Sequence, residues 1–178
     1  MPTIRTSILK AIAKTCSKDT SRSSLACIHV VTRAGHLVVE ASDSARVTRY
    51  EELTDSTRLM TDGEWLVPPK ALTAESFTDM RPEWTLDPAH ESYPKVLRLF
   101  EHCEELLKAT PTTRQAFYPA LLAGTLKVHA DIAKAVKHLD ALQIVDVRLA
   151  DCEAVITSRT EDDAVLVHSI VMGVRKPI

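Results

Sequence analysis

The densest group of chemically reactive side chains in the sequence is EHCEE, at residues 101–105. Histidine, cysteine and glutamate are residue types that bind zinc, and a glutamate can serve as the general base of a hydrolase. The apolar spacing around this group predicts a helix, and a solvent-exposed acidic helix face accounts for the same glutamates. We therefore favour an acidic helix face and predict no metal site, and a small hydrolase that uses EHCEE is the weakest alternative.

Other patterns that support catalysis are missing from the sequence. Loops that cradle phosphate need closely spaced glycines. The four glycines of this chain stand far apart, at Gly35, Gly63, Gly124 and Gly173. No serine lies in a nucleophile elbow, and no cysteine and histidine are spaced as a catalytic pair. We predict that the protein is not an enzyme and that it uses no cofactor.

A second stretch of interest is SDSARVTRYEEL, residues 42–53. It follows the strand-like run HLVVEA and carries Asp43 and Arg46 where a hairpin would need only a polar turn. Considered by themselves, these residues leave the role of the pair open.

Length and composition favour one globular domain with a buried core, because the chain has 178 residues, of which 45% are hydrophobic and 26% charged. Its four cysteines occur singly, which favours a reducing cytoplasm over a disulfide scaffold. No run of residues approaches the roughly 20 apolar residues of a membrane span, and the N-terminus lacks a long apolar segment. We expect a soluble cytoplasmic protein without a membrane partner.

The net charge of −2 conceals an uneven distribution of charge along the chain. Residues 1–50 hold eight basic and three acidic residues, residues 51–110 hold six and 13, and residues 111–178 hold eight of each. A basic N-terminal third could contact phosphate, but a solvated helix face explains such charges more often.

The first half of the sequence predicts a helix followed by an antiparallel meander. Apolar residues at three- and four-residue spacing predict a helix over about 3–17. SLACIHVVTR, GHLVVEASD and ARVTRYEEL predict three strands, with a glycine turn in RAGH. EWLVPPKALTAESF predicts a short strand, a Pro-Pro stop and a helical turn after Pro69. TDMRPEWTLDPAHESYP is expected to be irregular, and VLRLFEHCEELLKA to form a helix.

The second half repeats this pattern. Pro119 and the apolar stripe after it predict a helix over about 119–139. LQIVDVRLA, CEAVITSRT and AVLVHSIVMGVR predict three further strands. Helix plus meander, present twice, predicts an α+β fold with antiparallel sheet. We place the halves at about 1–80 and 112–178, with an acidic connector at 81–111.

Four segments, in order, resemble one family. ILKAIAKTCSKDTSRSSLACIHVVTRAGHLVVEASDSARV is similar to the first half of a bacterial sliding-clamp domain, the β subunit of DNA polymerase III. WLVPPKAL, SYPKVLRLF and HSIVMGVRKPI are similar to later family segments. The resemblance implies one DNA-clamp-like domain over residues 1–178, with two helix-plus-sheet halves and no catalytic activity. Because a clamp ring contains six such domains, the resemblance also implies a homo-oligomer.

In this family the helices face a central hole, which gives the basic helix faces a purpose. The resemblance implies duplex DNA as a non-specific partner, held by mobile phosphate contacts that do not read sequence. The candidate residues share helix faces at 100° per residue. They are Lys10, Lys14 and Lys18 on the first helix, and Lys127, Lys134 and His138 on the second. An ordinary solvent-facing lysine stripe is the alternative.

The family also binds short peptides of replication and repair proteins in a hydrophobic cleft. By position, the resemblance assigns eight residues to that cleft: Arg46, Val47, Pro94, Arg98, Leu99, Ile170, Met172 and Arg175. Aliphatic walls would bury a peptide anchor, while arginines close the rim. In this interpretation Asp43 fixes the turn and Arg46 borders the groove, whereas the alternative is that both stabilise a strand end. The interpretation requires segments 42–47 and 170–175 to lie side by side.

These inferences predict a non-catalytic, sliding-clamp-like accessory protein that associates with DNA or with replication proteins. The alternative is an interaction or scaffold module that has the clamp fold but does not encircle DNA.

Overall fold

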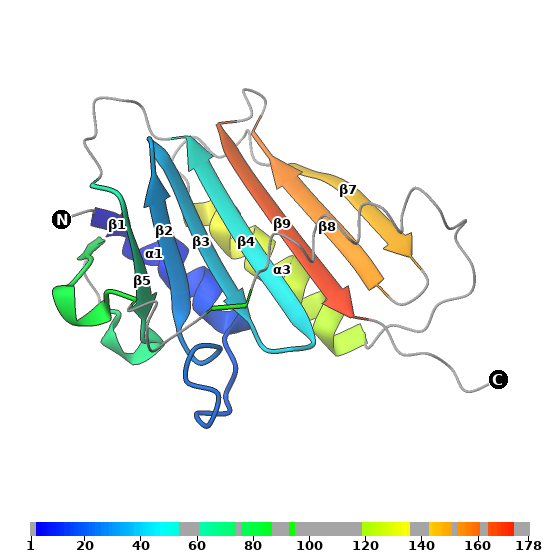
Figure 1. Cartoon of the computed structure of the whole chain (residues 1–178). Coiled ribbons are helices and arrows are strands. Elements are labelled where there is room, and N and C mark those ends of the chain that lie inside the picture. Colours follow the sequence, from blue (N-terminus) through cyan, green and yellow to red (C-terminus); the bar gives the residue numbers. More distant parts are fainter. Residues whose placement is uncertain are drawn as a thin grey trace.

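A seven-stranded antiparallel sheet forms the centre of the molecule, with the strand order β5-β2-β3-β4-β9-β8-β7. The computed structural model describes residues 3–53, 61–73, 76–86, 93–94, 119–135, 143–150, 153–160 and 164–172. Helices α1 and α3 lie together on one face of the sheet, behind it in the view of Figure 1. The described part of the chain therefore has two layers, one of strands and one of helices.

The first half of the sheet is the predicted meander. Strands β2 (Ile28–Arg33), β3 (His36–Ser42) and β4 (Arg46–Leu53) pair in succession, and β5 (Gly63–Val67) pairs with the other edge of β2. The turn between β2 and β3 places Ala34 at φ 46° and Gly35 at φ 83°. Two successive positive φ values suit the twist of a tight hairpin, and glycine adopts this conformation without steric cost.

The second half of the sheet is a second meander of β7 (Gln143–Ala150), β8 (Glu153–Arg159) and β9 (Val165–Met172). Strands β4 and β9 join the two meanders, with Arg46 opposite Val171 and Val47 opposite Ile170. The two candidate segments that the sequence required to be neighbours are therefore neighbours where the structure describes them. More than 100 residues of chain separate these paired positions, so local propensity alone could not have produced the contact.

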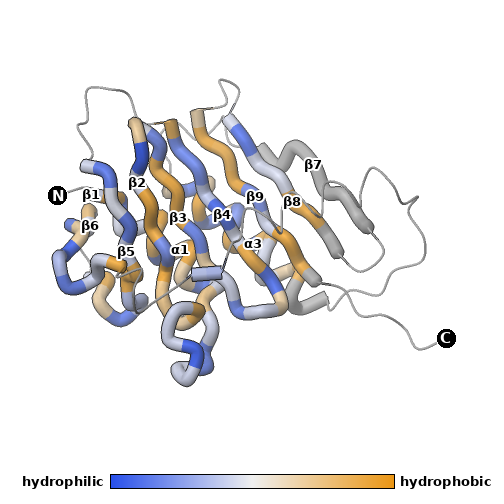
Figure 2. Tube along the Cα trace, viewed as in Figure 1, coloured by the Kyte–Doolittle hydropathy of each residue, from blue (hydrophilic) through white to orange (hydrophobic). Residues whose placement is uncertain are grey.

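The helices cover the sheet with their apolar faces. Helix α1 (Thr6–Ile12) continues into the 3-10 turn η1 (Ala13–Thr15), and α3 spans Pro119–Ala135. Ile8, Leu9 and Ile12 of α1 and Ile132 of α3 are at most 1% exposed. They pack on the inner residues of β2 and β3, the strands along which Figure 2 shows a concentration of hydrophobic residues. Along each strand, side chains that point to the helices alternate with side chains that point to the opposite face. This alternation fixes the register of the sheet.

The chain ahead of α1 differs from the prediction. Residues expected to begin a helix form strand β1 (Thr3–Arg5). It pairs with β6 (Phe77–Asp79), where the stretch expected to be irregular begins. A side-chain hydrogen bond from Thr3 Oγ1 to Asp79 Oδ1 at 2.7 Å supports the pair. The hydroxyls of Thr6, the first residue of α1, and Thr78 of β6 are 2.9 Å apart and form a second one beside it. A three-residue strand stabilised by a partner far along the chain leaves no periodic signal in the sequence.

Two further short elements complete the described chain. The 3-10 turn η2 (Pro69–Ala71) is the helical turn predicted after Pro69, and η3 (Pro82–Trp84) is a second one. The helix predicted from VLRLFEHCEELLKA, including EHCEE, lies outside the described residues. Neither described helix combines the length and apolar character that a membrane crossing requires.

Candidate functional site

The outward face of the helix layer carries a group of lysines. In α3 the exposed residues recur every three or four positions, and η1 and α1 show the same spacing. These residues are Ser7, Lys10 and Lys14 near the N-terminus, and Ala123, Lys127, Ala130 and Lys134 in α3. Since the opposite helix faces are buried against the sheet, the lysines point away from it. We call Lys10, Lys14, Lys127 and Lys134 the lysine face.

One carboxylate lies among these lysines. Asp131 Oδ2 is 2.5 Å from Lys14 Nζ, and Asp131 Oδ1 is 4.0 Å from Lys134 Nζ. The Lys14 hydrogen bond, helped by the charges of Lys134 and Lys127, holds the pKa of Asp131 below its usual value. Asp131 therefore remains ionised and links η1 to α3.

The structure places the predicted DNA-contacting residues unevenly. Lys10, Lys14, Lys127 and Lys134 share the helix layer as expected. Lys18 is exposed but lies in the loop beyond η1, because the helical segment ends at Thr15. His138 lies outside the described residues.

The turn between β3 and β4 is built around Asp43. Its Oδ1 accepts hydrogen bonds from the backbone N–H groups of Ala45 at 3.1 Å and Arg46 at 3.0 Å, and its Oδ2 pairs with Arg46 Nε at 2.9 Å. Ser44, the residue between them, has φ 76°, a conformation that the surrounding hydrogen bonds must hold. The prediction that Asp43 fixes the turn is confirmed.

The guanidinium of Arg46 lies on the helix side of the sheet. Its Nη2 donates to the carbonyl oxygen of Lys14 at 2.6 Å, and its Nη1 lies only 3.0 Å from where a Cβ on Gly124 of α3 would stand. Glycine at that position leaves room for the guanidinium beside the helix. Arg46 thus connects the turn to Lys14 of η1, whose side chain belongs to the lysine face.

Val47 and Ile170 lie on the opposite face of the sheet, because successive strand residues alternate in direction. They are 2% and 1% exposed and belong to a second apolar cluster with Tyr93. The other buried members are Leu66, Leu86 and Val155. The segments of the predicted groove are therefore together, but Arg46 and Val47 face different layers and the two aliphatic side chains are enclosed.

The other predicted groove residues are described less completely. Pro94 is exposed. Met172 is the last residue of β9, and the structure describes its backbone only. Arg98, Leu99 and Arg175 lie outside the described residues.

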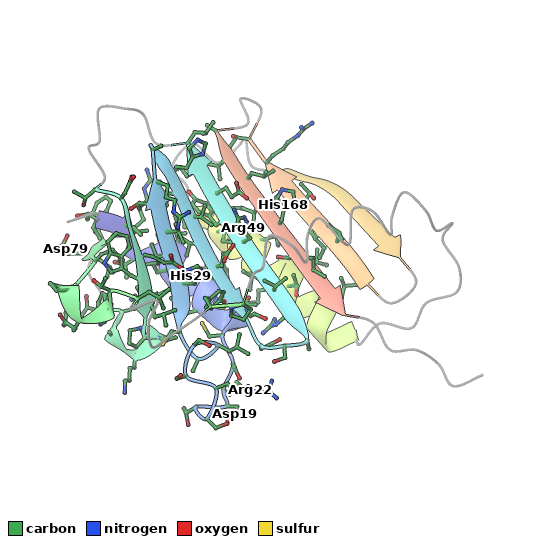
Figure 3. The ribbon with its side chains drawn as sticks, in the orientation of Figure 1. Asp19, Arg22, His29, Arg49, Asp79 and His168 are labelled. Carbon is green, nitrogen blue, oxygen red and sulfur yellow. The ribbon has the colours of Figure 1, made fainter. Side chains whose placement is uncertain are left out.

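A polar row that sequence reasoning missed crosses the face of the sheet opposite the helices. His29, Glu40, Arg49 and His168 occupy directly opposed positions on β2, β3, β4 and β9, and Figure 3 labels three of them on this face. Glu40 is 3% exposed and pairs with both His29, at 3.0 Å, and Arg49. A shallow pocket of about 210 Å³ lies beside them. Alternating polar residues in the predicted strands were the available signal, but only the register reveals the row.

A buried histidine links the helix layer to both meanders. His129 of α3 is 1% exposed, with Nδ1 2.6 Å from Ser158 Oγ and Nε2 2.8 Å from Ser169 Oγ. Ser169 continues the network to Thr48 of β4 at 2.9 Å. Burial lowers the pKa of His129 to about 4, with His168 contributing. The imidazole is therefore neutral, which lets it donate through one nitrogen and accept through the other.

The described residues offer no constellation for metal binding. No group of three or more histidine, cysteine, aspartate or glutamate side chains converges within the described ranges. EHCEE lies outside these ranges.

Solved structures of similar shape are bacterial sliding clamps. The DNA polymerase sliding clamp from Bacillus subtilis matches with a TM-score of 0.57 and 14% identity, over 98% of this chain and 64% of that one. The clamp from Pseudomonas aeruginosa matches with a TM-score of 0.59 and 13% identity, over 98% of this chain and 66% of that one. This chain thus spans less than two thirds of their length. No protein-family model matches the sequence, and no curated protein is significantly similar to it.

Proposed function

We propose that this chain is a non-catalytic accessory protein that contacts duplex DNA through the lysine face and engages replication or repair proteins near the β4–β9 junction. Its fold supports the proposal, because the α+β architecture with antiparallel sheet, predicted from the sequence, is that of a DNA polymerase sliding clamp. The observation that carries the proposal is the gathering of Lys10, Lys14, Lys127 and Lys134 on the side of the helix layer turned away from the sheet.

Physical chemistry supports non-specific DNA contact by such a face. Exposed lysines are compact, hydrated charges on flexible stems, so they can follow phosphates without fixing a register. The other exposed residues of this outward face, Ser7, Ala123 and Ala130, are small, so no bulky side chain among them keeps a duplex away from the lysines. Binding of this kind is weak and depends strongly on salt.

Contact with partner peptides is the second component of the proposal. The pairing of β4 with β9 supports it, since this pairing unites two of the three segments that resemble those lining the family's cleft. Because Val47 and Ile170 are enclosed in the free chain, a peptide would bind beside them or after the cluster opens.

Titration of a labelled mixed-sequence duplex, followed by fluorescence anisotropy at several salt concentrations, tests the DNA component. We expect a dissociation constant on the order of 10⁻⁴ to 10⁻⁶ M near physiological salt. Lys127→Glu should weaken binding and lower the slope of log affinity against log salt by about 0.9 or more, since one phosphate contact is lost. Lys70→Glu makes the same charge change on η2, outside the helix layer, and should have a much smaller effect.

Two results would contradict this component. The wild-type protein could show no binding even at low salt, or Lys70→Glu could weaken binding as much as Lys127→Glu. The second result would mean that net charge, and not the lysine face, governs association.

The alternative is an interaction module that keeps the clamp fold without encircling DNA. Solution mass separates the two possibilities. A closed higher oligomer favours encirclement, and a monomer at working concentration favours the interaction module.

A further inference from the structure

Asp131 is the one acidic residue in the sequences of α1, η1 and α3. It lies within 4.0 Å of two members of the lysine face, Lys14 and Lys134. Its side chain is 22% exposed, whereas those of Lys14 and Lys134 are 50% and 81% exposed. The carboxylate thus lies lower in the surface than the ammonium groups around it.

Both carboxylate oxygens are directed at lysines. Oδ2 accepts a short charge-assisted hydrogen bond from Lys14 at 2.5 Å, and Oδ1 lies 4.0 Å from Lys134. A carboxylate in this position offers the lysines what a DNA phosphate would offer, namely a negative oxygen within hydrogen-bond distance. Lys14 can bind a phosphate fully only if its bond to Asp131 weakens.

We propose that Asp131 acts as an internal competitor for phosphate that occupies Lys14 and limits the affinity of the lysine face for duplex DNA. This inference rests on the proposed function. A moving protein needs contacts that break readily, and removing one lysine from the set of effective phosphate contacts weakens binding and reduces its dependence on salt. Asp131 would therefore set the strength of the contact without touching DNA.

The substitution Asp131→Asn tests the inference because asparagine has nearly the same shape and removes only the charge. In the anisotropy titration, Asp131→Asn should bind duplex DNA about three- to tenfold more tightly than wild type and steepen the salt slope by about 0.9, since one more lysine is available for phosphate. Asp62→Asn removes an equal charge from an exposed residue outside the helix layer and should change affinity much less.

A second substitution identifies the lysine concerned. Adding Lys14→Gln to Asp131→Asn should return the salt slope to the wild-type value, because the released contact is then removed. Lys10→Gln should lower the salt slope by a similar amount, about 0.9, in the wild-type protein as well as in Asp131→Asn, since Lys10 is not paired with Asp131 in the structure. Thermal melting of each variant checks that the helix layer remains folded.

The outcomes separate this inference from the proposed function. If wild type binds DNA and Lys127→Glu weakens binding, but Asp131→Asn equals wild type, the competitor role is wrong and the DNA function stands. If Asp131→Asn and Asp62→Asn tighten binding equally, the effect is one of net charge and the inference also fails. If neither wild type nor Asp131→Asn binds DNA at low salt, both proposals fall.

Discussion

At the scale of single residues, Asp43 shows how one side chain organises a region. By accepting two backbone N–H groups and one guanidinium, it holds a tight turn in which Ser44 has a positive φ. The arginine that it orients then donates to the carbonyl oxygen of Lys14 in η1. Asp43 and Arg46 therefore stabilise the end of the β3–β4 hairpin and also connect it to η1.

His129 makes stability depend on pH, and the direction follows from its burial. Its pKa is about 4 in the folded protein against 6.5 for an ordinary histidine. Between these values the unfolded chain binds a proton that the folded chain does not, so stability is lost as pH falls from about 6.5 to 4. The loss should approach about 3 kcal/mol, since each pKa unit corresponds to about 1.4 kcal/mol.

Urea unfolding at about pH 7 and about pH 4.5 measures this effect. His129→Gln is the control, since it keeps a donor and an acceptor but cannot titrate. The variant should be less stable than wild type near neutrality. It should lose less stability on acidification, because residue 129 no longer titrates and only the other ionisable groups contribute to the loss. An equal loss in both proteins would show that His129 does not carry the effect.

At the scale of elements, the β4–β9 pair determines how the two halves share a core. Ile170 is 1% exposed in the cluster with Val47 and Tyr93, so it behaves as a core residue in the free protein. Ile170→Ala should lower the free energy of unfolding by about 2–4 kcal/mol, the cost of truncating a buried isoleucine. Leu53→Ala on β4, where the side chain is 52% exposed, should cost far less.

Denaturant titration of both variants provides the comparison. If Ile170→Ala were as stable as Leu53→Ala, Ile170 would be a preformed groove wall and the enclosed cluster would be wrong.

The sequence predicted the elements well where periodicity was strong. The six meander strands, the turn at Gly35 and helix α3 were all visible, because each is locally consistent in pattern and turn chemistry. Strands β1 and β6 were not, since two three-residue strands depend on each other across the chain. Lys18 was extrapolated from helical spacing, but the helical segment ends before it, at Thr15.

The candidate site could be predicted only in part, for a similar reason. Spacing identified the lysines, because helix faces follow from 100° per residue. It could not reveal Asp131 as their partner, because that contact joins α3 to η1 and depends on tertiary packing. The enclosure of Val47 and the row through His29 and Arg49 likewise depend on strand register, which local sequence does not encode.

At the scale of the whole molecule, the two layers divide the polar chemistry. The helix layer presents lysines with one aspartate, whereas the opposite face of the sheet presents balanced ion pairs around Glu40 and an apolar cluster. The small net charge of the chain therefore conceals a basic surface. This division makes the helix layer the face that should meet DNA, with the sheet turned away from it.

Site-specific photo-crosslinking to duplex DNA tests this orientation most directly. A benzophenone side chain at Ala130, exposed between Lys127 and Lys134, should crosslink to a mixed-sequence duplex at low salt. The same group at Leu53, which is 52% exposed and projects from β4 to the opposite face, should crosslink far less. Added salt should suppress the Ala130 crosslink, since the contacts are electrostatic. Equal crosslinking at both positions, or crosslinking at Leu53 alone, would contradict the assignment of the helix layer as the DNA-facing surface.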